Sequence, residues 1–166
     1  VPSNIGFSIN VEHDLAFADE ADLVVITPIP RSAWAHVDER VCEVVRRAVA
    51  RGAWVLTVCS GAFVVAAAGV LAGRRATTHW RYADTMAAMY PDIDVDPNVL
   101  YVQDGRIITS AGTAAGLDAC LHLLRIELGA EMTNTIARRM VVPPQRDGGQ
   151  AQFIATPLPA TTSLSL

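Results

Sequence analysis

Hydrophobic and polar positions along this chain repeat with two different periods. Short apolar runs at residues 21–26 and 54–58 are typical of strands fully buried in a parallel sheet. Between them, residues 36–51 place apolar side chains every three or four positions, as an amphipathic helix does, and Gly52 ends the pattern. Strict alternation at residues 5–11 predicts an earlier strand.

The rest of the chain continues the alternation of strands and helices. The pattern predicts a short strand at residues 76–78 and a hairpin of strands 99–102 and 106–110, whose turn carries Asp104-Gly105. Helices are expected at residues 60–71, 81–89, 117–128 and 131–140. Strands that alternate with helices predict an α/β fold, a three-layer sandwich with a mostly parallel sheet.

Composition limits the class of protein. A chain of 166 residues, 51% of them hydrophobic and 18% charged, suits one folded domain and excludes disorder for most of its length. Residues 148–166 carry no charge and no periodicity, so we expect a domain at residues 1–147 followed by a linker or disordered tail. A net charge of −4 and a pI near 5.5 argue against DNA binding by this chain itself.

One uncharged stretch, residues 52–73, is long enough to span a membrane. Its polar and small residues gather at Cys59-Ser60-Gly61, which favours a buried strand, a sharp turn and a buried helix instead. The three cysteines, Cys42, Cys59 and Cys120, have no zinc-site spacing, and free thiols indicate a reducing cytoplasm. The sequence therefore predicts no membrane span, no metal and no cofactor.

The candidate chemistry begins at the turn between the strand at 54–58 and the following helix. A side chain at such a turn is raised from the carboxyl edge of the sheet, which is the geometry of a nucleophile elbow. The helix N-terminus beyond Cys59 is expected to lower the pKa of its thiol. The alternative is that Cys59 is a small apolar residue buried in a tight turn.

A second set of residues follows at the ends of later strands. His79 comes twenty residues after Cys59, behind Thr78, where the end of an adjacent parallel strand would bring imidazole and thiol together. The alternative for His79 is an ordinary hydrogen-bonded histidine. Gly112 lies at a strand-to-helix turn, and Asp118 is a weak candidate for orienting His79. The candidate catalytic residues are thus Cys59, His79 and Asp118, and the candidate ligand-binding residues are Cys59, Ser60, Gly61, Thr78, His79 and Gly112.

The acidic residues Asp92, Asp94 and Asp96 imitate the start of a calcium loop. Pro97 stands where that loop requires glycine and Gln103 where it requires glutamate, so we interpret the three carboxylates as a solvated face.

Two segments resemble a known family. Residues 58–80 (VCSGAFVVAAAGVLAGRRATTHW) resemble the elbow-to-histidine segment of the ThiJ/PfpI superfamily, the class I glutamine amidotransferase-like fold. More narrowly, residues 104–154 are similar to the end of the amidase-like sensor domain of AraC-type transcriptional regulators. The resemblance implies a flavodoxin-like sheet, a homodimer, a small-molecule ligand, and DNA binding only through a C-terminal helix-turn-helix domain that this chain does not contain.

The chain departs from the family pattern in four places. The family's first strand and helix, which carry an acidic residue in many members, would precede Phe7, so we expect either that they lie before Val1 or that an oligomer covers their place. Pro28-Ile29-Pro30 replaces the glycine-rich loop that helps to form an oxyanion hole, and proline has no N–H to donate. Arg81 stands where amidotransferases carry glutamate, and the chain ends where a DNA-binding domain would begin.

Three functions follow from these residues. The first is a ligand-sensing regulatory domain without strong catalysis, which the prolines and the missing acid favour. The second is a cysteine-dependent hydrolase, hydratase or amidase like isocyanide hydratase, which the spacing of Cys59 and His79 favours. The third is a bare dimerisation module.

Overall fold

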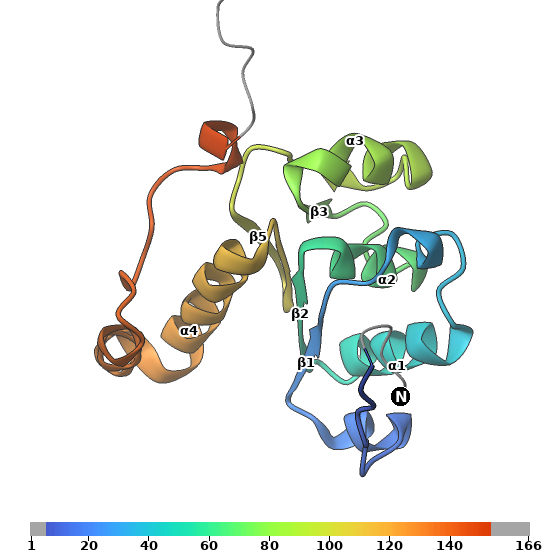
Figure 1. The fold of residues 1–166 in the computed structure, drawn as a ribbon, viewed down its shortest axis with the longest axis horizontal. Coiled ribbons are helices and arrows are strands. Elements are labelled where there is room, and N and C mark those ends of the chain that lie inside the picture. Colours follow the sequence, from blue (N-terminus) through green and yellow to red (C-terminus); the bar gives the residue numbers. More distant parts are fainter. Residues whose placement is uncertain (1–5, 154–166) are drawn as a thin grey trace, which may run out of the picture.

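The computed structural model describes residues 6–153, which form a four-stranded sheet covered by helices (Figure 1). The strand order is β1 (Leu23–Ile26), β2 (Trp54–Val58), β6 (Ile107–Ser110) and β5 (Tyr101–Asp104). The first three strands are parallel, and β5 pairs with β6 as an antiparallel hairpin. The sheet is therefore mostly parallel, as the sequence predicted.

Helices cover both faces of this sheet, which gives three layers. Helices α1 (Glu39–Ala50) and α2 (Ala62–Ala67) lie on one face, and α4 (Thr113–Met140) lies on the other (Figure 1). Val55 of β2 packs in the larger core with the first two helices, whereas its neighbour Leu56 packs against α4. This alternation follows from the two-residue repeat of a strand.

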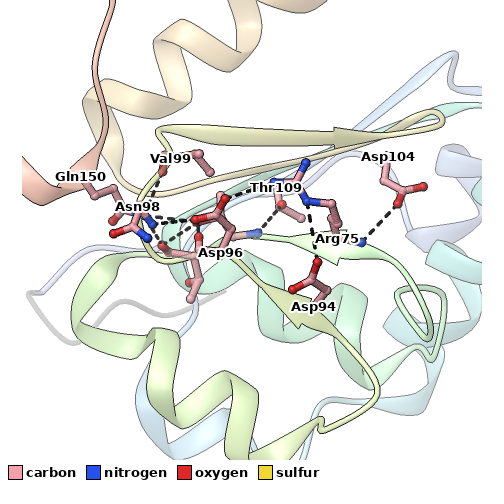
Figure 2. A network of polar contacts seen from close by, with 10 residues as sticks. Arg75, Asp94, Asp96, Asn98, Val99, Asp104, Thr109 and Gln150 are labelled. Atoms are coloured by element: carbon pink, nitrogen blue, oxygen red, sulfur yellow. Dashed lines mark hydrogen bonds and ion pairs between the residues drawn. The ribbon is translucent and has the colours of Figure 1, made fainter.

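A smaller unit lies beside the main sheet. Strands β3 (Arg75–Ala76) and β4 (Asp94–Val95) form a separate parallel pair, accompanied by helix α3 (Trp80–Met89). The N–H of Thr77 donates to the hydroxyl of Thr109 on β6 at 2.8 Å, which joins this unit to the main sheet (Figure 2). We expected the strand before His79 to adjoin the strand before Cys59, and this was wrong because β6 occupies that place.

Several local predictions are confirmed. The hairpin turns at Gly105, whose φ of 60° is a conformation that glycine adopts readily. The two expected C-terminal helices are the two parts of α4, separated by the non-helical φ of 80° at Gly129. Short 3-10 turns supplement the helices at Leu15–Glu20, Arg31–Ala33, Cys59–Gly61 and Gln150–Phe153.

The N-terminal expectations need correction. The described part of residues 5–11 forms no strand, and Phe7, Ile9 and Val11 are each more than half exposed. Strand β1 exists, but it is an edge strand with Leu23 and Val25 exposed, not the fully buried strand we expected. Alternating apolar residues form a strand only where another part of the protein buries one of the strand's faces. Among the described residues nothing buries the apolar side chains of residues 7–11.

Some elements end at other residues than the sequence predicted. Helix α2 stops at Ala67, well short of the expected residue 71. The linker expected from residue 148 is wrong for its first part, because Gly149 forms a β-bridge with Val99 and Gln150 is 2% exposed. Residues 149 and 150 therefore pack against the domain, and residues 154–166 of the expected tail lie outside the described residues. No helix within residues 6–153 combines the length and the apolar character needed to cross a membrane.

Candidate functional site

Two parallel strands bring the candidate residues to one edge of the sheet. In their register Val58 of β2 lies beside Ser110 of β6, so the residues that follow both strands emerge together. These residues are Cys59 after β2 and Gly112 after β6. Gly116, one turn into α4, would place a Cβ 3.1 Å from Val58, so its lack of a side chain allows helix and strand to approach closely.

The turn at Cys59 has a strained backbone, as a nucleophile elbow would, and the elbow itself stays a prediction. Cys59 has a φ of 54°, in the left-handed region that residues other than glycine rarely adopt. Gly61, two residues later, could carry no side chain, because a Cβ there would lie 2.5 Å from the carbonyl oxygen of Ile26. Close packing of the turn against the end of β1 therefore holds Cys59 in this conformation.

Ser60 fixes the proline-rich loop to this turn. Its hydroxyl accepts a hydrogen bond from the N–H of Ile29 at 3.1 Å and donates to the carbonyl of the same residue at 2.9 Å. Ile29 stands between Pro28 and Pro30, neither of which has an N–H. The three residues of this loop therefore have no N–H left to stabilise an oxyanion.

His79 is the N-cap of helix α3. Its Nδ1 accepts a hydrogen bond from the N–H of Arg81 at 3.2 Å. Burial, and to a smaller extent the charge of Arg81, lowers the pKa of His79, so its imidazole is neutral at pH 7. A neutral ring that accepts at Nδ1 carries its proton on Nε2, which makes that atom a donor.

Thr78 connects the histidine strand to the elbow. Its buried hydroxyl donates to the carbonyl oxygen of Cys59 at 2.9 Å. Ser60, Gly61 and Thr78 thus hold the elbow in place through their contacts. As ligand-binding residues they remain predictions, and they do not line the cavity described next.

Cys59, His79 and Gly112 line one cavity of about 330 Å³. The imidazole lies against Gly112, where a Cβ would be 3.6 Å from His79 Cδ2. We call these three residues the inner wall of the cavity. The remaining sides are formed by Trp80, Leu100, the start of α4 and the C-terminal residues Arg146, Gln150 and Phe153. The predicted pair thus lies in one cavity, although no hydrogen bond joins Cys59 and His79 in the described structure.

The protonation state of the thiol differs from our expectation. Burial raises the pKa of Cys59, and a hydrogen bond from the N–H of Ser60 offsets this only in part. The pKa values of Cys42 and Cys120 are raised by burial as well. The pKa of Cys59 is therefore raised and not lowered as we expected, because loss of water outweighs the hydrogen bond from the N–H of Ser60.

Asp118 does not orient His79. Its carboxylate, 8% exposed, pairs with Arg146, whose Nε lies 3.0 Å from both carboxylate oxygens. The pair joins α4 to the C-terminal segment, so the weak catalytic assignment of Asp118 is replaced by a structural one. The carboxylate Asp96 has structural contacts too, to Arg75 and to the N–H of Asn98 (Figure 2). No group of three or more metal-ligating side chains occurs among the described residues.

Sequence reasoning missed the C-terminal wall of the cavity. Arg146, Gln150 and Phe153 stand in a segment that has no periodicity, and part of it was expected to be a linker. The one feature of the sequence that could have indicated this wall is the presence of Gln150 and Phe153 among small residues. No period or spacing connects such residues to a site about seventy positions earlier.

The chain belongs to the DJ-1/PfpI family, which residues 1–126 match. It is 35% identical over 107 residues to the isonitrile hydratase of Pseudomonas putida, covering 64% of this chain and 46% of that enzyme. It is 33% identical over 103 residues to the HTH-type transcriptional regulator ArgR of Pseudomonas aeruginosa, covering 62% of this chain and 31% of the regulator. The chain thus spans less than half of either relative.

Solved structures share the fold. An AraC family transcriptional regulator from Pseudomonas putida has a TM-score of 0.69 at 19% identity, over 84% of this chain and 75% of that one. DJ-1beta of Drosophila melanogaster has a TM-score of 0.67 at 22% identity, over 78% and 69%. These likenesses show that the fold is shared, and the function has to be argued from the residues of the site.

Proposed function

We propose that this chain is the ligand-sensing domain of an AraC-type transcriptional regulator and that its cavity binds a small molecule without thiol-dependent catalysis. The observation that carries the proposal is that His79 caps helix α3 through its Nδ1. A base that activates a thiol needs a free lone pair. The lone pair at Nδ1 accepts the N–H of Arg81, and Nε2 carries the proton.

The loop after β1 supports the same conclusion. A hydrolase or amidase stabilises a developing oxyanion with N–H groups, and removing one such donor costs about 10²–10³ in rate. The N–H of Ile29 is engaged by Ser60, and the flanking prolines supply none. Relatives that include the HTH-type regulators ArgR, CdhR and GlxA agree with a regulatory role.

In this role the cavity offers an apolar surface with a few polar groups. Trp80, Leu100 and Phe153 supply apolar area, and Nε2 of His79 would donate a hydrogen bond to a bound molecule. DNA binding would belong to a helix-turn-helix domain beyond the described residues, and dimerisation would bring two such domains to one operator. We place the regulator in the cytoplasm.

The alternative is a cysteine-dependent hydratase. The strained φ of Cys59 and its place in a cavity with His79 favour it, as does the similarity to an isonitrile hydratase. In that case Cys59 Sγ would add to the isonitrile carbon, and the thiol proton would pass to the same carbon to give a thioimidate. Water would then add across its C=N bond, and cleavage of the C–S bond would release an N-substituted formamide and restore the thiol. Before it could act as a base, the imidazole of His79 would have to break its hydrogen bond with the N–H of Arg81.

One pair of variants separates the two functions. Thermal-shift screening of the chain against a panel of amino acids, amines and carboxylates identifies ligands. For a sensor, binding survives Cys59→Ala and is lost in Thr113→Trp, which fills the cavity from the start of α4. Hydration of aliphatic isonitriles by the wild-type chain, abolished in Cys59→Ala, would instead establish the enzyme.

A further inference from the structure

The segment of residues 146–153, which we call the C-terminal strap, closes one side of the cavity. It contributes Arg146, Gln150 and Phe153 to the lining of the same cavity as the inner wall. It is held at its start by the ion pair of Arg146 with Asp118 and at its centre by Gln150. The strap is also the last described part of the chain, so any change in its path changes the direction in which the chain continues.

Gln150 anchors the strap through its whole amide group. Its Oε1 accepts from the N–H of Trp80 at 2.6 Å, in the first turn of α3. Its Nε2 donates to the carbonyl oxygens of Thr78 and Val99, both at 3.0 Å, and lies 3.2 Å from the hydroxyl of Thr77. Figure 2 shows Gln150 beside Asn98 and Val99, where its own N–H donates to Asn98 at 2.7 Å.

Three of these partners, Thr77, Thr78 and Trp80, belong to the same segment as His79. Thr78 and Trp80 flank the histidine in sequence, and the hydroxyl of Thr78 donates to Cys59. A side chain that is 2% exposed and bonded on both sides of His79 cannot leave without exposing or stranding these backbone groups. The position of the strap and the geometry of the inner wall are therefore linked by direct contacts.

We propose that Gln150 is a positioning residue that couples occupancy of the cavity to the path of the C-terminal strap, and that the strap is the output element of the sensor. This inference rests on the proposed function, since it states how that same cavity would signal. The strap has two states, one held by the hydrogen bonds of Gln150 and one released from them. A ligand that contacts both His79 and Phe153 changes the equilibrium between these two states. By thermodynamic reciprocity, releasing the strap changes the accessibility and affinity of the cavity.

The test uses Cys59 as a reporter and two matched glutamine-to-glutamate variants, one in the strap and one directly before it. Gln150→Glu keeps the size of the side chain but places a carboxylate against the carbonyls of Thr78 and Val99, whereas Gln145→Glu makes the same change at an exposed position. Iodoacetamide labelling read by mass spectrometry should be about tenfold faster at Cys59 in Gln150→Glu than in Gln145→Glu, since local opening governs access. Equal rates would overturn the proposal.

Buried Cys42 serves as the internal control for folding. If Cys42 is also labelled rapidly in Gln150→Glu, this variant is unfolded. The coupling is then tested in the wild-type chain alone. Its Cys59 is alkylated with iodoacetamide, so that the added group occupies the cavity, and amide exchange is followed. Coupling predicts a several-fold change in exchange at residues 146–153 with none in β2, and unchanged exchange in the strap would contradict it.

The two proposals fail in different ways. Coupling without any ligand in the thermal-shift panel would support the strap mechanism and leave sensing without support. Ligand binding with equal Cys59 labelling in the two glutamate variants would remove the strap mechanism and leave sensing intact.

Discussion

The inner wall of the cavity stands on the buried centre of the sheet, whereas the C-terminal strap lies on its periphery. Phe63, directly after the elbow, is 0% exposed, but Phe153 of the strap is 56% exposed. Packing around β2 and α2 holds the Cys59 part of the inner wall, whereas the strap is held by one ion pair, by the side-chain amide of Gln150 and by backbone contacts with Asn98 and Val99. A wall set in the core and a wall at the periphery of one cavity are suited to a site that responds to binding.

The largest expected contrast comes from the same substitution made in the core beneath the inner wall and in the strap. Phe63→Ala removes a ring stacked on Trp34 at 4.0 Å between centroids and should cost about 3–5 kcal/mol of unfolding free energy. Phe153→Ala should cost less than about 0.5 kcal/mol, as is usual for exposed positions. Urea denaturation measures both. Similar losses in the two variants would mean that the strap belongs to the core.

A pair of glycines sharpens the contrast. Gly61→Ala places a Cβ 2.5 Å from the carbonyl oxygen of Ile26 and should cost about 1–3 kcal/mol through strain in the core. Gly149→Ala would drive its Cβ into the backbone carbonyl of Asn98, so the strap has to shift, and we expect a smaller drop in Tm than for Gly61→Ala together with faster alkylation of Cys59. Gly112→Ala is the control, because its Cβ has only ordinary contacts. A large drop in Tm for Gly149→Ala would show that the strap is not separable.

The reactivity of Cys59 should depend on pH in a way that reports its burial. Because burial raises its pKa, the alkylation rate should climb about tenfold per pH unit from pH 7 to 9 without levelling off. Releasing the strap with Gly149→Ala should return the pKa toward that of an ordinary thiol, and the rate should level off at lower pH. Mass spectrometry also compares the three cysteines, and we expect Cys59 to react first because it alone lines the cavity. Faster labelling of Cys120 would contradict the assignment of the elbow.

The smallest effect concerns His79 and stability. Its pKa is lowered in the folded chain, so the unfolded chain binds more protons and stability falls as the pH drops through the ordinary histidine range. His79→Asn keeps a side chain that can cap α3 but does not titrate. The decrease in Tm between pH 7.5 and 5 should be smaller in this variant than in the wild-type chain. An equal decrease would place the pH dependence on other groups, such as His122, whose pKa burial also lowers.

Local patterns accounted for part of the inner wall. The apolar run of β2 and the small residues after it predicted the strand-to-helix turn at Cys59, because turn residues and strand periods act within a few positions. His79 lines the same cavity as Cys59, but the expected reason was wrong, since its strand does not adjoin β2. Two details of the wall could not be predicted. The pKa of Cys59 depends on how much water surrounds it, and the proton of His79 depends on the N–H that faces its Nδ1.

The sequence by itself determined the layers, the parallel strands, the hairpin and the break at Gly129, since each is set by the period of apolar residues or by a residue with special backbone freedom. Only the tertiary structure decided that β1 is an exposed edge, that Asp118 pairs with Arg146, and that Gln150 closes the cavity. These contacts join residues between 28 and 73 positions apart. The amide of Gln150 has four hydrogen-bond partners that are distant in sequence. No periodic pattern in the sequence marks such contacts, because only the folded chain brings these groups together.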